Sequence, residues 1–311
     1  MNIGLLGAVL LAAAPAPPER AADVERGASA APDGGTASTN DGGPADDGGG
    51  AAAAGVDETL RAEAALGRGD PASLEEAARG FETAALTSAE PGVPWLRAAR
   101  IRRGLAETAS LGAAAQHGGA AAPQLELATR ESQACSDDAR RAWRQAAPEA
   151  AAAQAARSSA EVAALVPLPV AEALYLDAVC ASLWARAQGI TPLLDRAAEL
   201  RAFFGRAALL APALDDAGPS RELGRLLAAI PAYAGGDLEL ARAHFEAALK
   251  AAPSARTRVA YAESVAVSLQ DRKLFEALLA PEIAVPDDRS ALADKARALL
   301  QRADELFGKA H

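Results

Sequence analysis

Aromatic and β-branched residues are scarce in this chain, and their scarcity narrows the folds that it can adopt. Phe, Trp and Tyr make up 4% of the 311 residues, whereas 50% are hydrophobic and many of those are alanine. Valine and isoleucine are sparse, and no sustained alternation of apolar and polar residues of the kind that strands need is present. Alanine has the highest helix propensity and allows helices to approach closely. We therefore predict an all-α protein.

The sequence also lacks the motifs that carry common enzyme chemistry. It contains no G-x-S-x-G, no Walker loop, no G-x-G-x-x-G and no H-E-x-x-H. The histidines, His117, His244 and His311, do not have the spacing of metal ligands, and the two cysteines form no C-x-x-C pair. No basic block interrupts a net charge of −10, so a nucleic-acid partner is not expected. We predict no catalytic residue, no cofactor and no metal.

Four pairs of adjacent acidic residues could suggest paired catalytic carboxylates. Neighbouring residues on a helix point about 100° apart, however, and these pairs mostly lie at predicted helix starts. There they complement the positive end of the helix dipole, so we predict caps or solvated faces. The pairs are Glu75–Glu76, Asp137–Asp138, Asp215–Asp216 and Asp287–Asp288.

The first 55 residues differ from the rest of the chain. Residues 3–14 form an apolar run that is too short to span a bilayer but has the length of a signal-peptide core. No basic residue precedes this run, and each A-x-A site is followed by proline. Residues 15–55 contain 14 Gly or Pro among 41 and cannot bury enough apolar surface to fold. We predict a signal-like segment over 1–14, a disordered linker over 15–55 and an exported helical domain over 56–311.

Within that domain, apolar periodicity and breaks at Gly, Pro and Asp predict a succession of helices with short connections. Short connections make successive helices antiparallel neighbours, as in bundles and α-solenoids. One helix begins after Asp70-Pro71. The others are expected at about 94–115, 123–147, 149–165, 168–188, 191–211, 219–233, 237–251, 255–269, 271–280 and 288–307.

A repeated spacing favours the solenoid. The second helix of a tetratricopeptide repeat (TPR) carries alanine, an aromatic residue four positions later, alanine three positions further on and proline five beyond that. The first three positions share a helix face, and the proline ends the helix. A full match and a partial match occur at Ala241, Phe245, Ala248 and Pro253, and at Phe204, Ala207 and Pro212. We predict an array of TPR-like helical hairpins, an α-solenoid that could close or form a ring on oligomerisation.

The C-terminal half has a more specific likeness. It contains RELGRLLAAIPAYAGGDLELARAHFEAALKAAPS, in which Gly235-Gly236-Asp237 follows a lengthened helix, and then VAYAESVAVSLQDRKLFEALL. Over residues 170–307 the chain resembles the T component (TatT) of tripartite ATP-independent periplasmic (TRAP) transporters. The resemblance implies a periplasmic accessory protein that binds a solute-binding P component. It also implies that the chain forms a homo-oligomer and binds a small apolar ligand. The alternative is a TPR scaffold of the cell envelope without a small ligand.

Cysteines bear on the compartment. A lipid anchor needs a cysteine just after the apolar run, but the only cysteines are Cys135 and Cys180, so no anchor is predicted. These two lie on different predicted helices, 45 positions apart. In an oxidising compartment they could form a disulfide, and otherwise they would be two small buried side chains.

Aromatic residues with a polar group suit a channel or groove that is apolar on one side and wet on the other. Ordinary core packing is the alternative for each of them. The candidates for ligand or partner contact are Tyr175, Trp184, Tyr233 and Tyr261.

Overall fold

The structure is a computed structural model, and it describes residues 48–114, 121–284 and 290–308. Of the residues discussed above, the signal-like segment, His117, Asp287–Asp288 and His311 lie outside the described residues, as does the predicted linker up to residue 47.

All regular elements of the described residues are helical, and none is a strand, which confirms the all-α prediction. The longer helices are α2 (Gly48–Arg68), α3 (Pro71–Ala85), α4 (Gly92–Ala114), α5 (Ala122–Ala146), α8 (Ala171–Gln188), α9 (Ile190–Leu210), α10 (Leu214–Ala229), α11 (Leu238–Ala251), α13 (Arg272–Ile283) and α14 (Ala291–Gln301). The shorter elements are α6 (Pro148–Ala153), α7 (Ser159–Ala164), η2 (Leu168–Val170), η3 (Ala232–Ala234), α12 (Ala255–Tyr261), the π-helical η4 (Ala262–Ala266) and α15 (Ala303–Phe307).

Side-chain caps explain where several helices begin. A carboxylate before the first turn accepts a hydrogen bond from a backbone N–H that has no partner within the helix. Asp70 accepts from the Ser73 N–H at 3.0 Å, Asp237 from Leu240 at 2.9 Å and Asp271 from Leu274 at 2.9 Å. These bonds set the starts of α3, α11 and α13 close to the predicted positions.

Several predicted boundaries were wrong. The predicted helix 255–269 is α12 followed by η4, and the described part of the predicted helix 288–307 is α14 followed by α15. Helix α2 begins at Gly48, inside the predicted linker, because the run of alanines over 51–54 favours helix. The predicted helix 149–165 is two helices, α6 and α7, and Ser158 forms a capping box with Glu161 at the start of the second. The predicted helix 219–233 ends at Ala229, since Pro231 cannot donate a helical hydrogen bond, and η3 follows.

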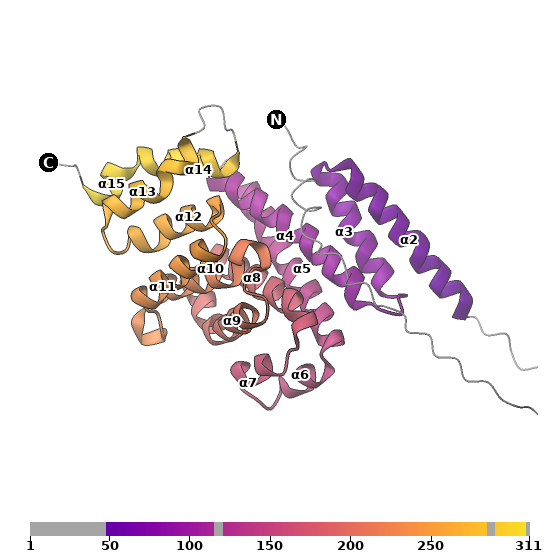
Figure 1. The fold of residues 1–311 in the computed structure, drawn as a ribbon. Helices are drawn as coiled ribbons and strands as arrows, with labels where there is room; N and C mark the ends of the chain where they lie inside the picture. Colours follow the sequence, from indigo (N-terminus) through magenta and orange to yellow (C-terminus); the bar gives the residue numbers. More distant parts are fainter. Residues whose placement is uncertain (1–47, 115–120, 285–289, 309–311) are drawn as a thin grey trace, which may run out of the picture.

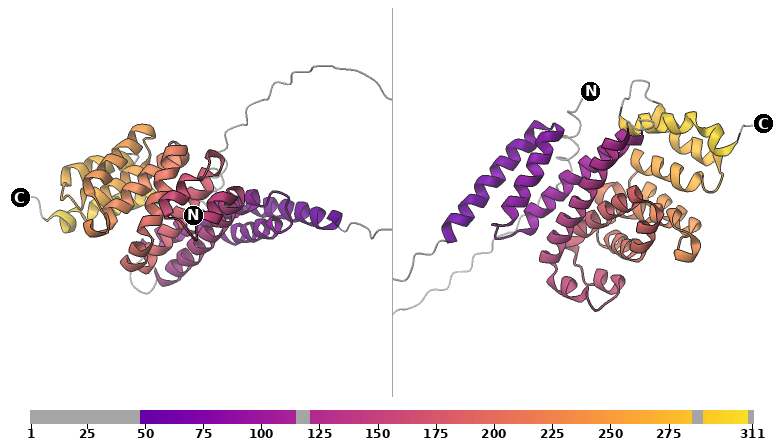
Figure 2. Two further views of the ribbon diagram at one scale, coloured as in Figure 1. Left: turned by 90° about the horizontal axis from the view of Figure 1, so that it is seen from below. Right: turned by 180° about the vertical axis from the view of Figure 1, so that it is seen from behind.

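The helices follow one another across the molecule (Figure 1), with the hairpin of α2 and α3 at one end and α13 to α15 at the other. The views from below and behind show the same order (Figure 2). In the C-terminal half, alternate helices also touch, since α8 contacts α10, α10 contacts α12 and α12 contacts α14. We call α8, α10, α12 and α14 the first layer.

The repeat-spaced residues build this half of the core. Ala241, Phe245 and Ala248 are buried on α11, and the Phe245 ring stacks on Tyr261 with 5.0 Å between ring centroids. Phe204 and Ala207 are buried in the same way on α9, and Pro212 and Pro253 follow the ends of α9 and α11. Gly224 lets α10 approach closely, because a Cβ there would lie 3.0 Å from the Ala241 carbonyl oxygen.

Helix α8 is fastened to α5 by a disulfide and by a buried carboxylate. Cys135 and Cys180 are bonded, with 5.8 Å between their Cα atoms. One turn before Cys180, the carboxylate of Asp177 is fully buried and accepts hydrogen bonds from three α5 side chains. The donors are Ser136 Oγ at 2.6 Å, Arg140 Nε and Nη2 at 3.0 and 3.1 Å, and Trp143 Nε1 at 2.9 Å.

Within the described residues, one stretch, Leu168–Gln188, is long and apolar enough to cross a membrane by length and composition alone. Its most apolar window is 72% buried inside the protein, as expected for the central helix of a core.

Candidate functional site

The four candidate aromatic residues do not converge on one site. Tyr261 is buried against Phe245, whereas Tyr233 on η3 is 86% exposed. Trp184 is partly buried, with the Arg196 guanidinium 5.1 Å from its ring centroid. Tyr175 belongs to a buried polar cluster, where its hydroxyl donates to Asp215 at 2.7 Å and its ring centroid lies 5.5 Å from the Arg103 guanidinium.

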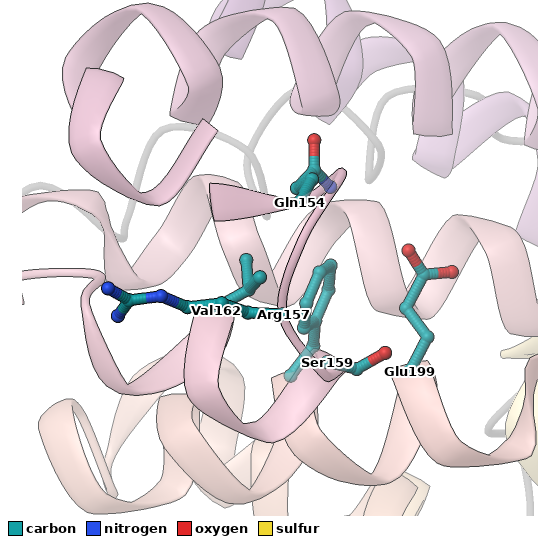
Figure 3. A pocket seen from close by; sticks show the side chains of 6 residues that line it. Gln154, Arg157, Ser159, Val162 and Glu199 are labelled. Carbon is teal, nitrogen blue, oxygen red and sulfur yellow. The ribbon is translucent and has the colours of Figure 1, made fainter. Parts of the chain in front are cut away.

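Two hollows near α9 are too small for a solute. The first has a volume of about 90 Å³ and lies between α9 and the segment that joins α6 to α7 (Figure 3). The second has a volume of about 60 Å³ and lies among α5, α8 and α9. Small-molecule sites typically enclose about 300–1,000 Å³. The hollows are lined by Gln154, Arg157, Ser159, Val162, Glu199 and Phe203, and by Gln133, Ser136, Asp137, Arg140, Ala181, Trp184 and Arg196.

A dense polar cluster lies where α4, α8 and α10 meet. We call Arg103, Tyr175, Asp215 and Arg221 the Asp215 cluster. One oxygen, Asp215 Oδ2, accepts hydrogen bonds from Arg103 Nη2, Arg221 Nη2 and Tyr175 Oη, each at 2.7 Å. Burial alone would raise the pKa of Asp215, but the two guanidiniums and the hydroxyl hold it well below its ordinary value.

The backbone at this cluster is strained. Asp215, Asp216 and Ala217 have φ angles of 51°, 54° and 58°, a left-handed conformation that costs a non-glycine residue about 1–2 kcal/mol. Arg221 Nη1 donates to the carbonyl oxygens of Asp215 and Asp216 at 3.1 and 3.4 Å. The same arginine therefore binds the Asp215 carboxylate and the carbonyls of the turn that presents it.

Gly218 completes the turn because no larger residue fits. A Cβ at this position would lie 2.2 Å from Tyr175 Oη and 2.8 Å from Asp215 Oδ2. The prediction of a cap or a solvated face for Asp215 was thus wrong, since its carboxylate faces buried arginines; Asp216 is exposed.

Beyond this cluster, charged residues continue across the first layer. We call five of these side chains the charged row: Arg186 on α8, Glu222 and Arg225 on α10, Glu263 on η4 and Lys295 on α14. Glu222 Oε2 lies 3.5 Å from Arg186 Nη2 and 3.6 Å from Arg225 Nη1. Glu263 accepts a hydrogen bond from Lys295 Nζ at 2.8 Å. The row thus links three helices of the layer and the π-helical turn, a type of element that is frequent at functional sites.

The electrostatics of the row are dominated by arginine. Burial alone would raise the pKa of Glu222, but Arg225, Arg221 and Arg186 hold it at about 2. Burial would likewise raise the pKa of Glu263, whereas Lys295, Arg225 and Arg186 lower it. Burial, assisted by repulsion from Arg225, lowers the pKa of Arg186 to about 10.

Two arginines of the row have unused donor capacity. Arg186 Nη2 is buried and has no hydrogen-bond partner among the described residues, and its 3.5 Å approach to Glu222 is an ion-pair contact. Arg225 also meets Glu222 at ion-pair distance only. The side chains of Arg186, Arg225 and Lys295 remain 25%, 27% and 24% exposed. Each of these three side chains is therefore partly exposed, although the Arg186 Nη2 atom itself is buried.

A second polar cluster lies at the junction of α3, α4 and α5. The Arg102 guanidinium meets three carboxylates, with Nε 2.7 Å from Glu82 Oε1, Nη1 2.7 Å from Glu131 Oε2 and Nε 3.2 Å from Asp138 Oδ2. Burial raises the pKa of Asp138 to about 8, and the Glu82 carboxylate adds to the rise. The predicted solvated pair Asp137–Asp138 is therefore wrong for Asp138, which is buried.

The Asp215 cluster and the charged row were not predicted from the sequence, because no sequence motif marks their residues. Their members come from segments far apart in the chain, and Arg103 is 112 positions from Asp215. The one local signal is RELGRLL, in which the charged Arg221, Glu222 and Arg225 stand among buried apolar residues, and two of the three are themselves buried.

The same region of the chain matches the model of a known protein family. A family model described as TRAP transporter T-component matches residues 126–307, more than half of the chain. The matched segment contains the whole charged row, Tyr175, Asp215 and Arg221, whereas Arg103 lies before it. The curated proteins searched contain no match to this chain.

Proposed function

This chain belongs to the TRAP transporter T-component family, and we propose that it is the periplasmic accessory of a solute-uptake system that binds the system's solute-binding protein. The observation that carries the proposal is that the family match spans the first layer and its partly exposed charged row. A surface of this kind suits a protein partner, whereas the two small hollows do not suit a solute.

We further propose that the C-terminal half is a TPR-like array. Its hairpins would be α8 with α9, α10 with α11, α12 with α13, and α14 with α15, and each would supply its first helix to the first layer. Stacked helical hairpins of this type bind partners on the surface that successive first helices share. The buried Ala241, Phe245 and Ala248 support this assignment, because they occupy the repeat-spaced positions of a second helix.

Export to the periplasm is part of the same proposal. The Cys135–Cys180 disulfide supports it, since disulfides persist in oxidising compartments and are rare in the cytosol. A small apolar ligand, if the system passes one, would need a channel built between copies of the chain, because the hollows near α9 hold only about 90 and 60 Å³.

The second candidate function is a TPR scaffold of the cell envelope without a transport partner. It is favoured by the partial exposure of Arg186 and Arg225, which line neither of the two hollows near α9. An envelope extract separates the two candidates when the full chain is used as bait and the bound proteins are identified by mass spectrometry.

The transport role predicts that a periplasmic solute-binding protein is the main partner and that the purified pair forms a complex on size-exclusion chromatography. Arg225→Glu should weaken this complex. Arg242→Glu should leave it unchanged, because Arg242 lies on α11, outside the first layer, with a 46% exposed side chain. Recovery of envelope assembly proteins alone would reject the transport role and support the scaffold.

A further inference from the structure

Charge is unevenly distributed between the charged row and the rest of the protein. The chain has a net charge of −10, yet the row contains three cations and two anions. Glu263 is satisfied by Lys295 at 2.8 Å, which leaves Arg186 and Arg225 to share the single carboxylate of Glu222. Among the described members of the row, the cations therefore outnumber the anions by one.

Glu222 does not satisfy both arginines. Its Oε1 already accepts a hydrogen bond from Arg221 Nε at 3.2 Å, and its Oε2 stays 3.5 Å from Arg186 and 3.6 Å from Arg225. Arg186 Nη2 is buried and has no hydrogen-bond partner in the part of the chain that the structure describes, an arrangement that is costly unless an acceptor is supplied. Guanidinium groups bind carboxylates through paired, charge-assisted hydrogen bonds, which are stronger than neutral ones.

We propose that Arg186 and Arg225 form a binding site for a carboxylate presented by an acidic segment of a protein partner. Charge complementarity identifies the occupant as acidic. Arg186 and Arg225 are partly exposed and line neither hollow, which favours a carboxylate held by a larger interface over a free small acid. The identity of that partner as the solute-binding protein rests on the function proposed above, but the site itself does not.

The test is fluorescence-anisotropy titration of the full chain with a labelled ten-residue peptide of alternating Glu and Ser. A matched peptide of alternating Gln and Ser is the control ligand. Binding of the Glu peptide should weaken about tenfold in Arg225→Gln, because one charge-assisted pair is lost. Arg225→Lys should recover only part of the affinity, since lysine keeps the charge but lacks the planar fork. Arg242→Gln should bind like the unaltered protein.

A gain-of-affinity variant keeps the test independent of folding damage. Glu263→Gln removes a nearby anion that competes for the same cations and should strengthen binding about threefold, as expected when a like-charged neighbour is removed. Equal binding of the Gln peptide, or an unchanged affinity in Arg225→Gln, would overturn the proposal. Full competition by millimolar succinate would overturn the assignment to a protein segment, because a free acid would then suffice.

The same variants separate this inference from the proposed function. If Arg225→Gln weakens the peptide but the solute-binding protein never binds, the site stands and the transport role fails. If the solute-binding protein binds the unaltered chain and Arg225→Gln with the same affinity, and the Glu peptide also binds both equally, the transport role stands and the carboxylate site fails.

Discussion

Replacing Asp215 by asparagine tests whether the Asp215 cluster holds α4, α8 and α10 together. The substitution keeps the size of the side chain and removes the charge that Arg103 and Arg221 share at 2.7 Å. Breaking a buried ion pair by removing one partner costs about 3–5 kcal/mol. Each arginine retains a second carboxylate, Glu107 at 2.8 Å for Arg103 and Glu222 at 3.2 Å for Arg221, so we expect the lower end, about 3 kcal/mol.

Chemical denaturation at pH 7, followed by circular dichroism, measures this loss directly. A loss of about 3 kcal/mol corresponds to a melting temperature roughly 6–12 °C lower for a domain of this size. Asp216→Asn is the matched control, because Asp216 has the same left-handed backbone but an exposed side chain. It should change the free energy of unfolding by less than about 0.5 kcal/mol.

The pH dependence provides a second, independent check. The folded-state pKa of Asp215 is lower than its unfolded value of about 3.9, so the unfolded chain takes up this proton first as the pH falls. Its stabilisation is therefore complete above about pH 5 and is lost progressively as the pH falls below about 4. The difference between the unaltered protein and Asp215→Asn should shrink over that range. A difference of less than about 0.5 kcal/mol at pH 7, or one that is equal at pH 7 and pH 3, would refute the reasoning.

Three further predictions concern Gly218, the disulfide and Asp138. Gly218→Ala should lower the free energy of unfolding by about 2–3 kcal/mol, because its Cβ would clash with the Tyr175 hydroxyl. Gly205→Ala is the control: its Cβ would meet nothing within 4 Å, and the free energy of unfolding should rise by about 0.5–1 kcal/mol. Equal melting temperatures for the two variants would contradict this prediction. Replacing Cys135 and Cys180 together by serine should lower the free energy of unfolding by about 4 kcal/mol, because the disulfide closes a loop of 45 residues. In urea unfolding, dithiothreitol should lower the free energy of unfolding of the unaltered protein by the same amount and leave that of the double variant unchanged. Asp138 has a pKa of about 8 in the folded protein, above its value in the unfolded chain. Between pH 4 and 8 the folded protein therefore retains a proton that the unfolded chain has released. This one group should lower the free energy of unfolding by up to about 1.4 kcal/mol for each unit that the pH rises. Asp138→Asn should flatten that slope in denaturation series from pH 5 to 8, and an unchanged slope would exclude the assignment.

The helices themselves could be predicted because their signals are local. Asp70, Asp237 and Asp271 precede their helices and cap them, and the spacing of Ala241, Phe245 and Ala248 identifies a buried face without knowledge of the partner helix. Where local signals compete, prediction failed. The alanine run that extends α2 to Gly48 outweighs the neighbouring glycines.

The polar clusters could not be predicted, because their chemistry depends on long-range packing. Asp138 and Asp215 belong to acidic pairs that look alike in sequence, yet the pKa of Asp138 is raised and that of Asp215 lowered. The difference follows from the neighbours. Asp138 shares the Arg102 guanidinium with two other carboxylates, and its second partner, Arg141, is 54% exposed. Asp215 binds two buried guanidiniums. Neither set of neighbours can be deduced from the residues beside the pair in the chain.

The contact between Arg103 and Asp215 also bears on what counts as an autonomous piece of this protein. Arg103 lies on α4, ahead of residue 126, where the family pattern begins, and Glu107 on the same helix binds Arg256 on α12 at 3.0 Å. A fragment cut at residue 126 would keep Asp215 and Arg256 but lose both of these partners. The stretch that the family model matches is thus shorter than the stretch that retains both of these ion pairs. Fragments for expression should begin before α4.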